Sequence, residues 1–308
     1  MITHFETPLL ESRALSRRCM KTISLKMEAW QPTGSFKNRG MGYACSIYRE
    51  RGAERFISSS GGNAGLAVAY AGRKLGVPVV VVVPKTTPER ARRLIAREDA
   101  EVIVHGDSWN EADAFARSLV HENDAFIHPF DDELLWMGHA SMIDEIARSA
   151  SQPDAIILSV GGGGLLCGVI EGLRRNDWHN VPVIAAETVG ADSYAQALKA
   201  NRVVNLPAIS SIATSLGARA VSSAALRAAT QHPVESAVVS DAAAVAGCLE
   251  LLEEHRVVVE PACGASVAAL DADLPALQRA RNVIVIVCGG VNASVEQLHA
   301  WSRTLAVA

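Results

Sequence analysis

Lys37 lies in the segment of residues 31–40, at a place where its amine could become reactive. The segment follows a predicted strand and should open a helix, with Ser35 as the N-cap and Phe36 as the first helical residue. Lys37 then falls in the first helical turn, where the helix dipole disfavours a cation by about 0.3–1 kcal/mol. A lysine that loses its proton readily can act as a nucleophile or form a Schiff base. The alternative is an ordinary lysine whose ammonium points into solvent.

A second turn, residues 58–65, combines hydroxyls, glycines and an asparagine between a predicted strand and a predicted helix. Its hydroxyls and the unpaired N–H groups of the helix start could hold a small anion such as a carboxylate. Gly, Ser and Asn are also the usual residues of turns, so a plain connection stays open as the alternative.

Four consecutive glycines, residues 161–164, form a third turn between a strand and a helix. Such a run loses much conformational entropy on folding, which makes it a poor choice for a mere connector. Unobstructed N–H groups at a helix start suit a phosphate. The dinucleotide fingerprint G-x-G-x-x-G fails here, because its third glycine would be Leu166 or Cys167, although Glu187 stands where a ribose-binding acid would lie. We therefore expect phosphate binding rather than a nicotinamide dinucleotide.

Cys288 ends another predicted strand, beside two glycines that would let a flat ligand approach closely. Taken alone, a packed structural thiol is the more ordinary interpretation. Together, a Schiff-base lysine, a carboxylate cradle and a phosphate cradle are what a pyridoxal-phosphate enzyme acting on an amino acid would need.

Short apolar strands and helices alternate along the chain and must position these turns. A length of 308 residues favours two domains, and the strands between about residues 40 and 135 could close one small sheet. Alternating elements predict an α/β fold with mostly parallel sheets covered on both faces, in which ligands bind where strands end and helices begin. Helices are predicted at 64–75 and from Pro88, the first helical residue after Thr87. Strands are predicted at 23–27, 56–58, 79–83, 102–105, 125–127, 155–160, 181–186 and 283–288.

Composition limits the classes of function. The chain is 49% hydrophobic and 20% charged, which excludes a disordered protein, and its net charge of −4 without a basic stripe argues against nucleic acid as a partner. No apolar run approaches the roughly 18–20 residues that cross a membrane, and residues 1–10 do not form a secretory signal. The six cysteines are scattered, as in proteins of a reducing compartment. We therefore expect a cytoplasmic protein.

Residues 26–28 followed by 32–40 resemble the lysine motif of the fold-type II pyridoxal-phosphate enzymes. The turn at 59–65 is similar to their substrate loop, and the glycine run to their phosphate loop. The similarity is greatest to the short L-serine/L-threonine dehydratases, or serine ammonia-lyases, and extends over nearly the whole chain. Further matching stretches are 128–132, 159–168, 260–264 and 287–290.

This resemblance implies a tryptophan synthase β-like fold of two α/β domains with the cofactor between them. The large domain would comprise residues 1–36 and 138–308, and the small domain residues 37–137. The implied reaction is β-elimination of L-serine, and also of L-threonine, to pyruvate or 2-oxobutanoate and ammonia. A degradative role, a homodimer and the absence of an appended regulatory domain are implied as well.

The resemblance also implies a role for each residue that matches a motif. Lys37 would hold pyridoxal 5'-phosphate as a Schiff base, and Phe36 would pack beside its ring. Asn63 would hydrogen-bond the phenolic oxygen, and Cys288 would face the pyridine nitrogen. The phosphate would take N–H groups from Gly161, Gly162, Gly163, Gly164 and Leu165. The substrate carboxylate would be received by Ser60, Gly61, Asn63 and Ala64.

Two further implications concern specificity and a cation. Glu187, Ala191 and Leu216 match the places where family members bind a potassium-like monovalent cation, which changes the interpretation of Glu187 from ribose acid to cation ligand. Racemases of the superfamily carry a serine two positions before the loop asparagine. Gly61 stands there instead, so elimination is favoured over racemisation, and the missing side chain should enlarge the pocket for L-threonine. A serine racemase is the nearest alternative, and an NAD-dependent Rossmann oxidoreductase or a non-enzymatic amino-acid-binding protein are alternatives from other classes.

Overall fold

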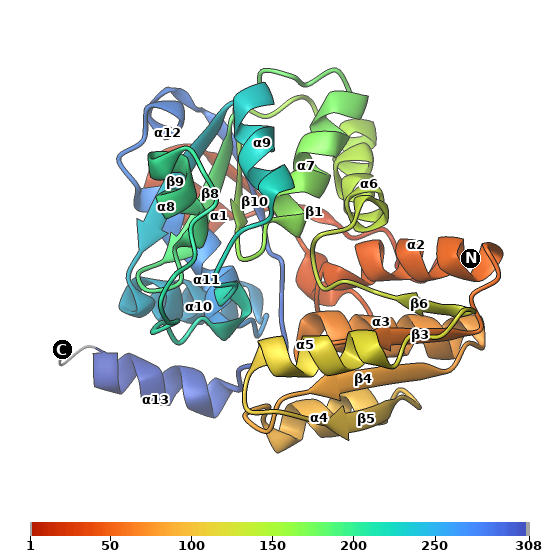
Figure 1. Ribbon diagram of the computed structural model, residues 1–308. Coiled ribbons are helices and arrows are strands. Elements are labelled where there is room, and N and C mark those ends of the chain that lie inside the picture. The colour runs from red at the N-terminus through yellow and green to blue at the C-terminus, as the bar shows by residue number, and fades with distance from the viewer. Residues whose placement is uncertain (1, 306–308) are drawn as a thin grey trace.

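The computed structural model describes residues 2–305, which form two β-sheets covered by helices (Figure 1). Neighbouring strands run parallel in both sheets, except that β1 is antiparallel to β2. The six-stranded sheet has the order β1 (Leu9–Glu11), β2 (Thr22–Lys26), β10 (Asn282–Ile286), β7 (Ala155–Ser159), β8 (Val183–Thr188) and β9 (Val234–Val239). The four-stranded sheet has the order β5 (Glu101–Val104), β4 (Val79–Val83), β3 (Arg55–Ser58) and β6 (Asp124–Phe126). The predicted α/β class with mostly parallel sheets is confirmed.

The helices connect these strands and cover both faces of each sheet. The α-helices are α1 (Arg13–Cys19), α2 (Lys37–Glu50), α3 (Asn63–Leu75), α4 (Glu89–Ala96), α5 (Trp109–Ser118), α6 (Glu133–Ser149), α7 (Gly164–Arg175), α8 (Ser193–Ala200), α9 (Ser223–Gln231), α10 (Asp241–His255), α11 (Pro261–Ala268), α12 (Pro275–Arg279) and α13 (Val295–Leu305). Single 3-10 turns are η1 (Glu28–Trp30), η2 (Thr214–Leu216) and η3 (Ala269–Asp271). Among the residues described, no helix combines the length and apolar character that crossing a membrane requires.

The four-stranded sheet is buried on both faces because successive side chains of a strand point to opposite sides. All five valines of β4 are buried. Val79, Val81 and Val83 pack in one apolar cluster with α3, while Val80 and Val82 pack in another with α5. The six-stranded sheet is arranged in the same way, with α11 contacting β7, β8 and β10, and α7 contacting β7. Each sheet therefore has its own core.

Several boundaries differ from the sequence expectation. The edge strands β1 and β9 were not predicted, since β1 has only three residues and β9 alternates weakly between buried and exposed positions. The helix expected to begin at Pro88 begins at Glu89, because Pro88 has an extended ψ of 142° and serves as the N-cap. These shifts of one or two residues at element ends leave the turns of interest in place.

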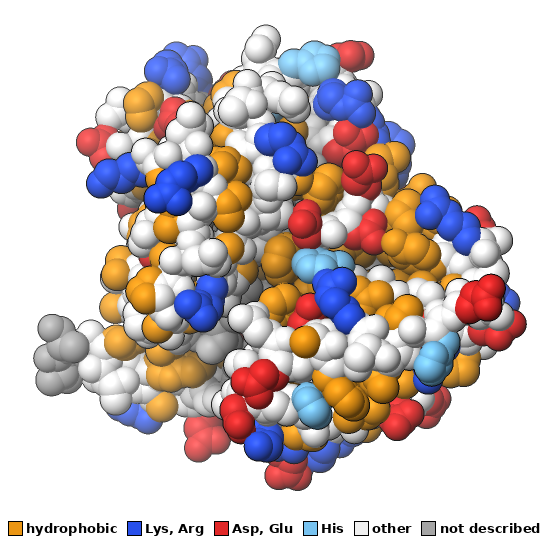
Figure 2. All heavy atoms as spheres, in the orientation of Figure 1, with side chains coloured by type: hydrophobic (Ala, Val, Ile, Leu, Met, Phe, Trp, Pro, Cys, Tyr) orange, Lys and Arg blue, Asp and Glu red, His pale blue; other side chains and the backbone are white. Residues whose placement is uncertain are grey.

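The two sheets meet along a few segments. The four-stranded sheet takes its strands from residues 55–126 only, and the six-stranded sheet takes its strands from both sides of that stretch. Helices α2 and α6 pack against each other beside this junction. We propose residues 37–137 as the small domain and residues 1–36 with 138–308 as the large one. On the face in Figure 2, positive and negative side chains are interspersed.

Candidate active site

Lys37 and Cys288 are brought together by backbone pairing between the loop before α2 and the segment after β10. Phe36 N donates to Cys288 O at 3.0 Å, and Gly290 N donates to Gly34 O at 2.8 Å. The glycine at position 289 is required here, because it has a φ of +85° and a Cβ on it would lie 2.2 Å from Gly34 O. The lysine segment is thus fixed to the end of a central strand.

The amine of Lys37 contacts the backbone of the segment before α6 and the ring of the preceding residue. Its Nζ donates to Pro129 O at 2.5 Å and lies 5.2 Å from the centroid of the Phe36 ring. Burial lowers the pKa of Lys37 to about 8, against the opposing charges of Cys288 and Glu260. A lowered pKa increases the fraction of neutral, nucleophilic amine near neutral pH.

The start of α2 corrects one expectation and confirms another. Lys37 lies in the first turn of α2, as the sequence indicated, although the helix begins at Lys37 itself and not at Phe36, and burial is the main cause of the lowered pKa of Lys37. Ser35 as N-cap is wrong: its Oγ is buried and has no hydrogen-bond partner in residues 2–305, and Phe36 precedes the helix with a helical backbone conformation. Phe36 instead packs its ring on His139, with centroids 4.8 Å apart.

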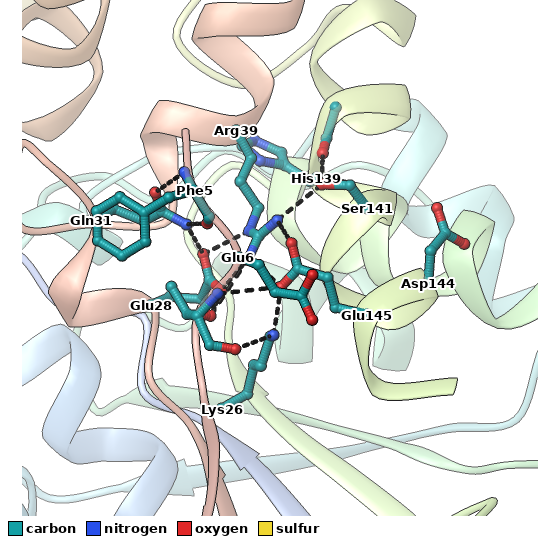
Figure 3. A network of polar contacts seen from close by, with 12 residues as sticks. Phe5, Glu6, Lys26, Glu28, Gln31, Arg39, His139, Ser141, Asp144 and Glu145 are labelled. Carbon is teal, nitrogen blue, oxygen red and sulfur yellow. Dashed lines mark hydrogen bonds and ion pairs between the residues drawn. The ribbon is translucent and has the colours of Figure 1, made fainter. Parts of the chain in front are cut away.

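Behind the lysine, Arg39 anchors α2 through a buried ionic network (Figure 3). Its fully buried guanidinium donates to both Glu28 and Glu145, at 2.6–2.8 Å. Lys26 forms a further ion pair with Glu145. These contacts join α2 to β2, η1 and α6. The sequence analysis assigned no role to Arg39, although its position two residues after Lys37 could have indicated that it supports the lysine segment.

The glycine run leaves a row of free N–H groups at the start of α7. No group in residues 2–305 accepts a hydrogen bond from the N–H of Gly161, Gly162 or Gly163, and the first N–H groups of α7, from Gly164 and Leu165, have no helical acceptor. Close packing also demands glycine: Cβ atoms would lie 2.3 Å from the Phe130 ring at position 162 and 2.3 Å from Ala225 Cβ at position 163. The geometry provides an anion cradle at a helix N-terminus.

In the turn before α3, the side chain of Asn63 is held by two hydrogen bonds, and the space beside Gly61 is occupied by Thr87. Asn63 begins the helix; its Nδ2 donates to Glu260 at 2.9 Å and its Oδ1 accepts from Val291 N at 3.0 Å. A Cβ at Gly61 would lie 2.6 Å from Thr87 Cγ2 and 2.7 Å from Thr87 Oγ1. The expectation that Gly61 enlarges the pocket is therefore wrong, because Thr87 fills that space.

Ser60 and Ala64 complete this turn. Ser60 Oγ accepts a hydrogen bond from Gly62 N at 3.3 Å, and Ala64 lies buried in the first turn of α3. The N–H groups at this helix start offer a second place for an anion, on the opposite sheet from the glycine run.

Cys288 is buried beside two other polar side chains. Its thiol hydrogen-bonds with Cys263 and Ser159, and the bond with Cys263 together with burial raises the pKa of the Cys288 thiol well above its usual range. Ser159 Oγ in turn lies 2.5 Å from Ser266 Oγ. A neutral thiol therefore lies at the end of β10 next to the lysine segment.

Glu187, near the end of β8, is a buried carboxylate to which no cationic side chain of residues 2–305 is paired. Its two oxygens accept from Tyr194 N and Ala195 N, each at 2.8 Å. Ala191 pairs with Thr188 in the same turn, whereas Leu216 lies in η2 against Gly161. Glu187 in β8 and Leu216 in η2 therefore lie on separate segments, and no hydrogen bond within residues 2–305 links them.

A family profile described as "Pyridoxal-phosphate dependent enzyme" matches residues 2–289. The chain belongs to this family. The cradle geometry fits a pyridoxal-phosphate enzyme, since free N–H groups suit the phosphate and a buried lysine of lowered pKa suits a Schiff base. As a fold-type II member of the pyridoxal-phosphate family, it presents these groups where strands end and helices begin.

Known proteins similar to this pyridoxal-phosphate enzyme include dehydratases and racemases. A fungal L-serine ammonia-lyase from Rhizomucor miehei superimposes with a TM-score of 0.91 and 38% identity, over 98% of each chain. An L-serine dehydratase/L-threonine deaminase from Bos taurus is 47% identical over 204 residues, which cover 65% of this chain and 62% of that protein. A serine racemase from Dictyostelium discoideum has a TM-score of 0.86 at 26% identity, over 95% of this chain and 94% of that one.

Proposed function

We propose that this pyridoxal-phosphate enzyme is an L-serine and L-threonine ammonia-lyase, which eliminates the β-hydroxyl and yields pyruvate or 2-oxobutanoate and ammonia. The observation that carries the proposal is a half-buried Lys37 with a pKa of about 8, fixed by backbone pairing to the segment after β10, in a chain that also presents free N–H groups at the starts of α3 and α7. The similarity to the fungal L-serine ammonia-lyase over 98% of the chain supports this choice of substrate.

The residues would divide the work as follows. Gly161–Gly164 and Leu165 would hold the cofactor phosphate through their N–H groups, and Phe36, Asn63 and Cys288 would hold its ring. Ser60, Gly61, Asn63 and Ala64 would receive the substrate carboxylate at the start of α3. When bound, the cofactor supplies an electron sink for charge that develops at the substrate's α-carbon. Lys37 Nζ would remove the proton from that carbon, since a neutral amine is available near neutral pH.

Elimination is favoured over racemisation by the contact between Gly61 and Thr87. Inverting a stereocentre requires a proton donor on the face opposite Lys37. A side chain at position 61 would lie within 2.7 Å of Thr87 and cannot be accommodated without movement. L-serine should therefore be deaminated with little formation of D-serine.

We further propose a monovalent cation, such as potassium, held by Glu187 with backbone oxygens of Ala191 and Leu216. The support is a buried carboxylate whose hydrogen-bond donors in the described part of the chain are neutral N–H groups, at a position that resembles the family's cation site. A homodimer and a cytoplasmic location are proposed from the resemblance to the short dehydratases, and six free cysteines suit a reducing compartment.

The decisive experiment replaces the lysine. In Lys37→Ala, we expect loss of the cofactor's visible absorbance band and at least a thousandfold loss of pyruvate formation from L-serine, because no other amine would replace it. Lys85→Ala is the control, since that exposed lysine pairs only with Asp107 on the surface. A Lys37→Ala protein that keeps the band and the activity would overturn the proposal. D-serine as the main product of the wild type would favour the racemase instead.

A further inference from the structure

Glu260 is a buried carboxylate that the proposed function does not use. It precedes α11 and is 3% exposed, and its side chain does not cap its own helix. Its Oε1 accepts from Asn63 Nδ2 at 2.9 Å, and its Oε2 accepts from the backbone N–H of Asn292 at 3.1 Å. The first of these bonds links the start of α3, on the four-stranded sheet, with the start of α11, on the six-stranded sheet.

The carboxylate also packs directly on the segment that holds the lysine loop. A Cβ at Gly290 would lie 2.0 Å from the carboxyl carbon of Glu260, so only glycine leaves room for it. Gly290 has a φ of +115° and donates its N–H to Gly34 O, three residues before Lys37. Glu260 therefore contacts both the loop of Asn63 and the strand end that fixes the lysine.

The side-chain amide of Asn63 is held in one orientation by this arrangement. Its Nδ2 can only donate, and it points to Glu260; its Oδ1 can only accept, and it faces Val291 N at 3.0 Å. A flipped amide would place oxygen against a carboxylate oxygen and NH₂ against N–H, which loses both bonds. The second N–H of Nδ2 has only a long contact, 3.5 Å to Ser215 Oγ, and is available to another acceptor.

The groups that surround the Glu260 carboxylate are neutral hydrogen-bond donors. Within residues 2–305, its hydrogen-bond partners are Asn63, Asn292 and Ser215, and no Lys or Arg forms an ion pair with it. Ser215 Oγ in turn accepts a hydrogen bond from Asn292 Nδ2 at 2.9 Å, so these partners of Glu260 are also bonded to each other. A carboxylate with two acceptor oxygens satisfies both donors at once, which a carboxamide cannot do.

We propose that Glu260 is a positioning residue that fixes the Asn63 amide with an N–H directed at the cofactor ring. The proposal rests on the proposed role of Asn63. Glu260 acts through Asn63 and touches neither substrate nor cofactor. The effect of Glu260 on the affinity for the cofactor should therefore depend on Asn63, while its charge acts separately on the pKa of Lys37.

A double-mutant cycle tests this dependence. We expect Glu260→Gln to weaken pyridoxal phosphate binding to the apo-protein about tenfold, or about 1.4 kcal/mol, and to shift the pH midpoint of the visible absorbance band. Asn63→Ala should shift the midpoint in the same direction. In the double variant, the effect of Glu260→Gln on the dissociation constant should disappear. Dissociation constants come from titration of the apo-proteins, and midpoints from spectra of the loaded ones.

Controls separate positioning from a general loss of structure. Glu235→Gln changes a carboxylate that accepts a backbone N–H at the start of α12, away from the cluster, and should move neither readout. Glu260→Asp keeps the charge but falls one methylene short of Asn63, so it should behave like Glu260→Gln; it replaces that variant if the latter does not fold. Additive effects in the double variant, or an unshifted midpoint in Glu260→Asp, would overturn the inference. A wild-type apo-protein that binds no pyridoxal phosphate would overturn the proposed function instead.

Discussion

Two kinds of buried carboxylate occur in this molecule, and they differ in what surrounds them. Glu28 and Glu145 are enclosed by Arg39 and Lys26, and the bonds from Arg39 lower the pKa of Glu145 although burial acts in the opposite direction. Within residues 2–305, Glu187 and Glu260 accept hydrogen bonds from neutral donors only, and burial raises the pKa of Glu187 to about 8 and raises that of Glu260.

The difference separates a structural role from a functional one. A buried carboxylate with a cationic partner is already compensated and stabilises the fold through its partner. A buried carboxylate without one is costly to keep charged, and it persists where a ligand or a particular orientation requires it. The ionic network joins α2 to β2, η1 and α6, whereas Glu187 lies near the end of β8 and Glu260 accepts a hydrogen bond from the site residue Asn63.

The largest effect should come from breaking the paired group. Arg39→Ala leaves Glu28 buried without a cation and leaves Glu145 with Lys26 alone, so we expect the free energy of unfolding to fall by about 3–5 kcal/mol. Arg39→Lys should lose less, because it keeps the charge but not the planar fork. Arg18→Ala removes exposed pairs with Glu250 and Asp271 and should cost at most about 1 kcal/mol. Chemical denaturation measures all three, and a loss below 1 kcal/mol in Arg39→Ala would contradict the structural role.

The second-largest effect on stability should come from binding of a monovalent cation to Glu187. At a hundredfold excess over its dissociation constant, potassium should stabilise the protein by about 2.7 kcal/mol relative to a bulky organic cation at equal ionic strength. Glu187→Gln removes the charge and should abolish most of this gain, and Glu235→Gln should leave it unchanged. Thermal unfolding in the two salts is the measurement. An equal gain in Glu187→Gln would remove Glu187 from the proposed cation site.

The smallest effect is a difference in pH dependence, at most about 1.4 kcal/mol per pH unit for one proton. Since the folded pKa of Glu145 is lowered, its contribution is present above about pH 4.5 and is lost as pH falls through the folded value. Since that of Glu260 is raised, the wild type loses stability relative to Glu260→Gln as pH rises from about 4.5 towards the folded value. Unfolding measured from pH 3 to 8, with Glu145→Gln alongside, should give slopes of opposite sign. Slopes of the same sign would contradict the distinction between the paired carboxylate Glu145 and the unpaired carboxylate Glu260.

The sequence predicted the turns better than the contacts between them. Each of the three strand–turn–helix signals, at Lys37, at Asn63 and at the glycine run, lies in the structure where its residue types indicated, because turn chemistry and helix starts are local properties. The partners of Arg39 and Glu260 were not predictable from spacing, since Glu145 and Asn63 are far away in the chain. Thr87 was missed for the same reason: nothing local tells that it fills the space beside Gly61.

The backbone pairing of Phe36 with Cys288 has a consequence for biosynthesis. Lys37 is translated long before β10 (Asn282–Ile286), the strand whose end holds its loop. Until β10 is inserted between β2 and β7, the lysine loop lacks its backbone hydrogen-bond partner and the sheet lacks a central strand. Capture of the vitamin-derived cofactor should therefore wait for the synthesis of β10, and a nascent chain stalled before residue 282 should emerge without it.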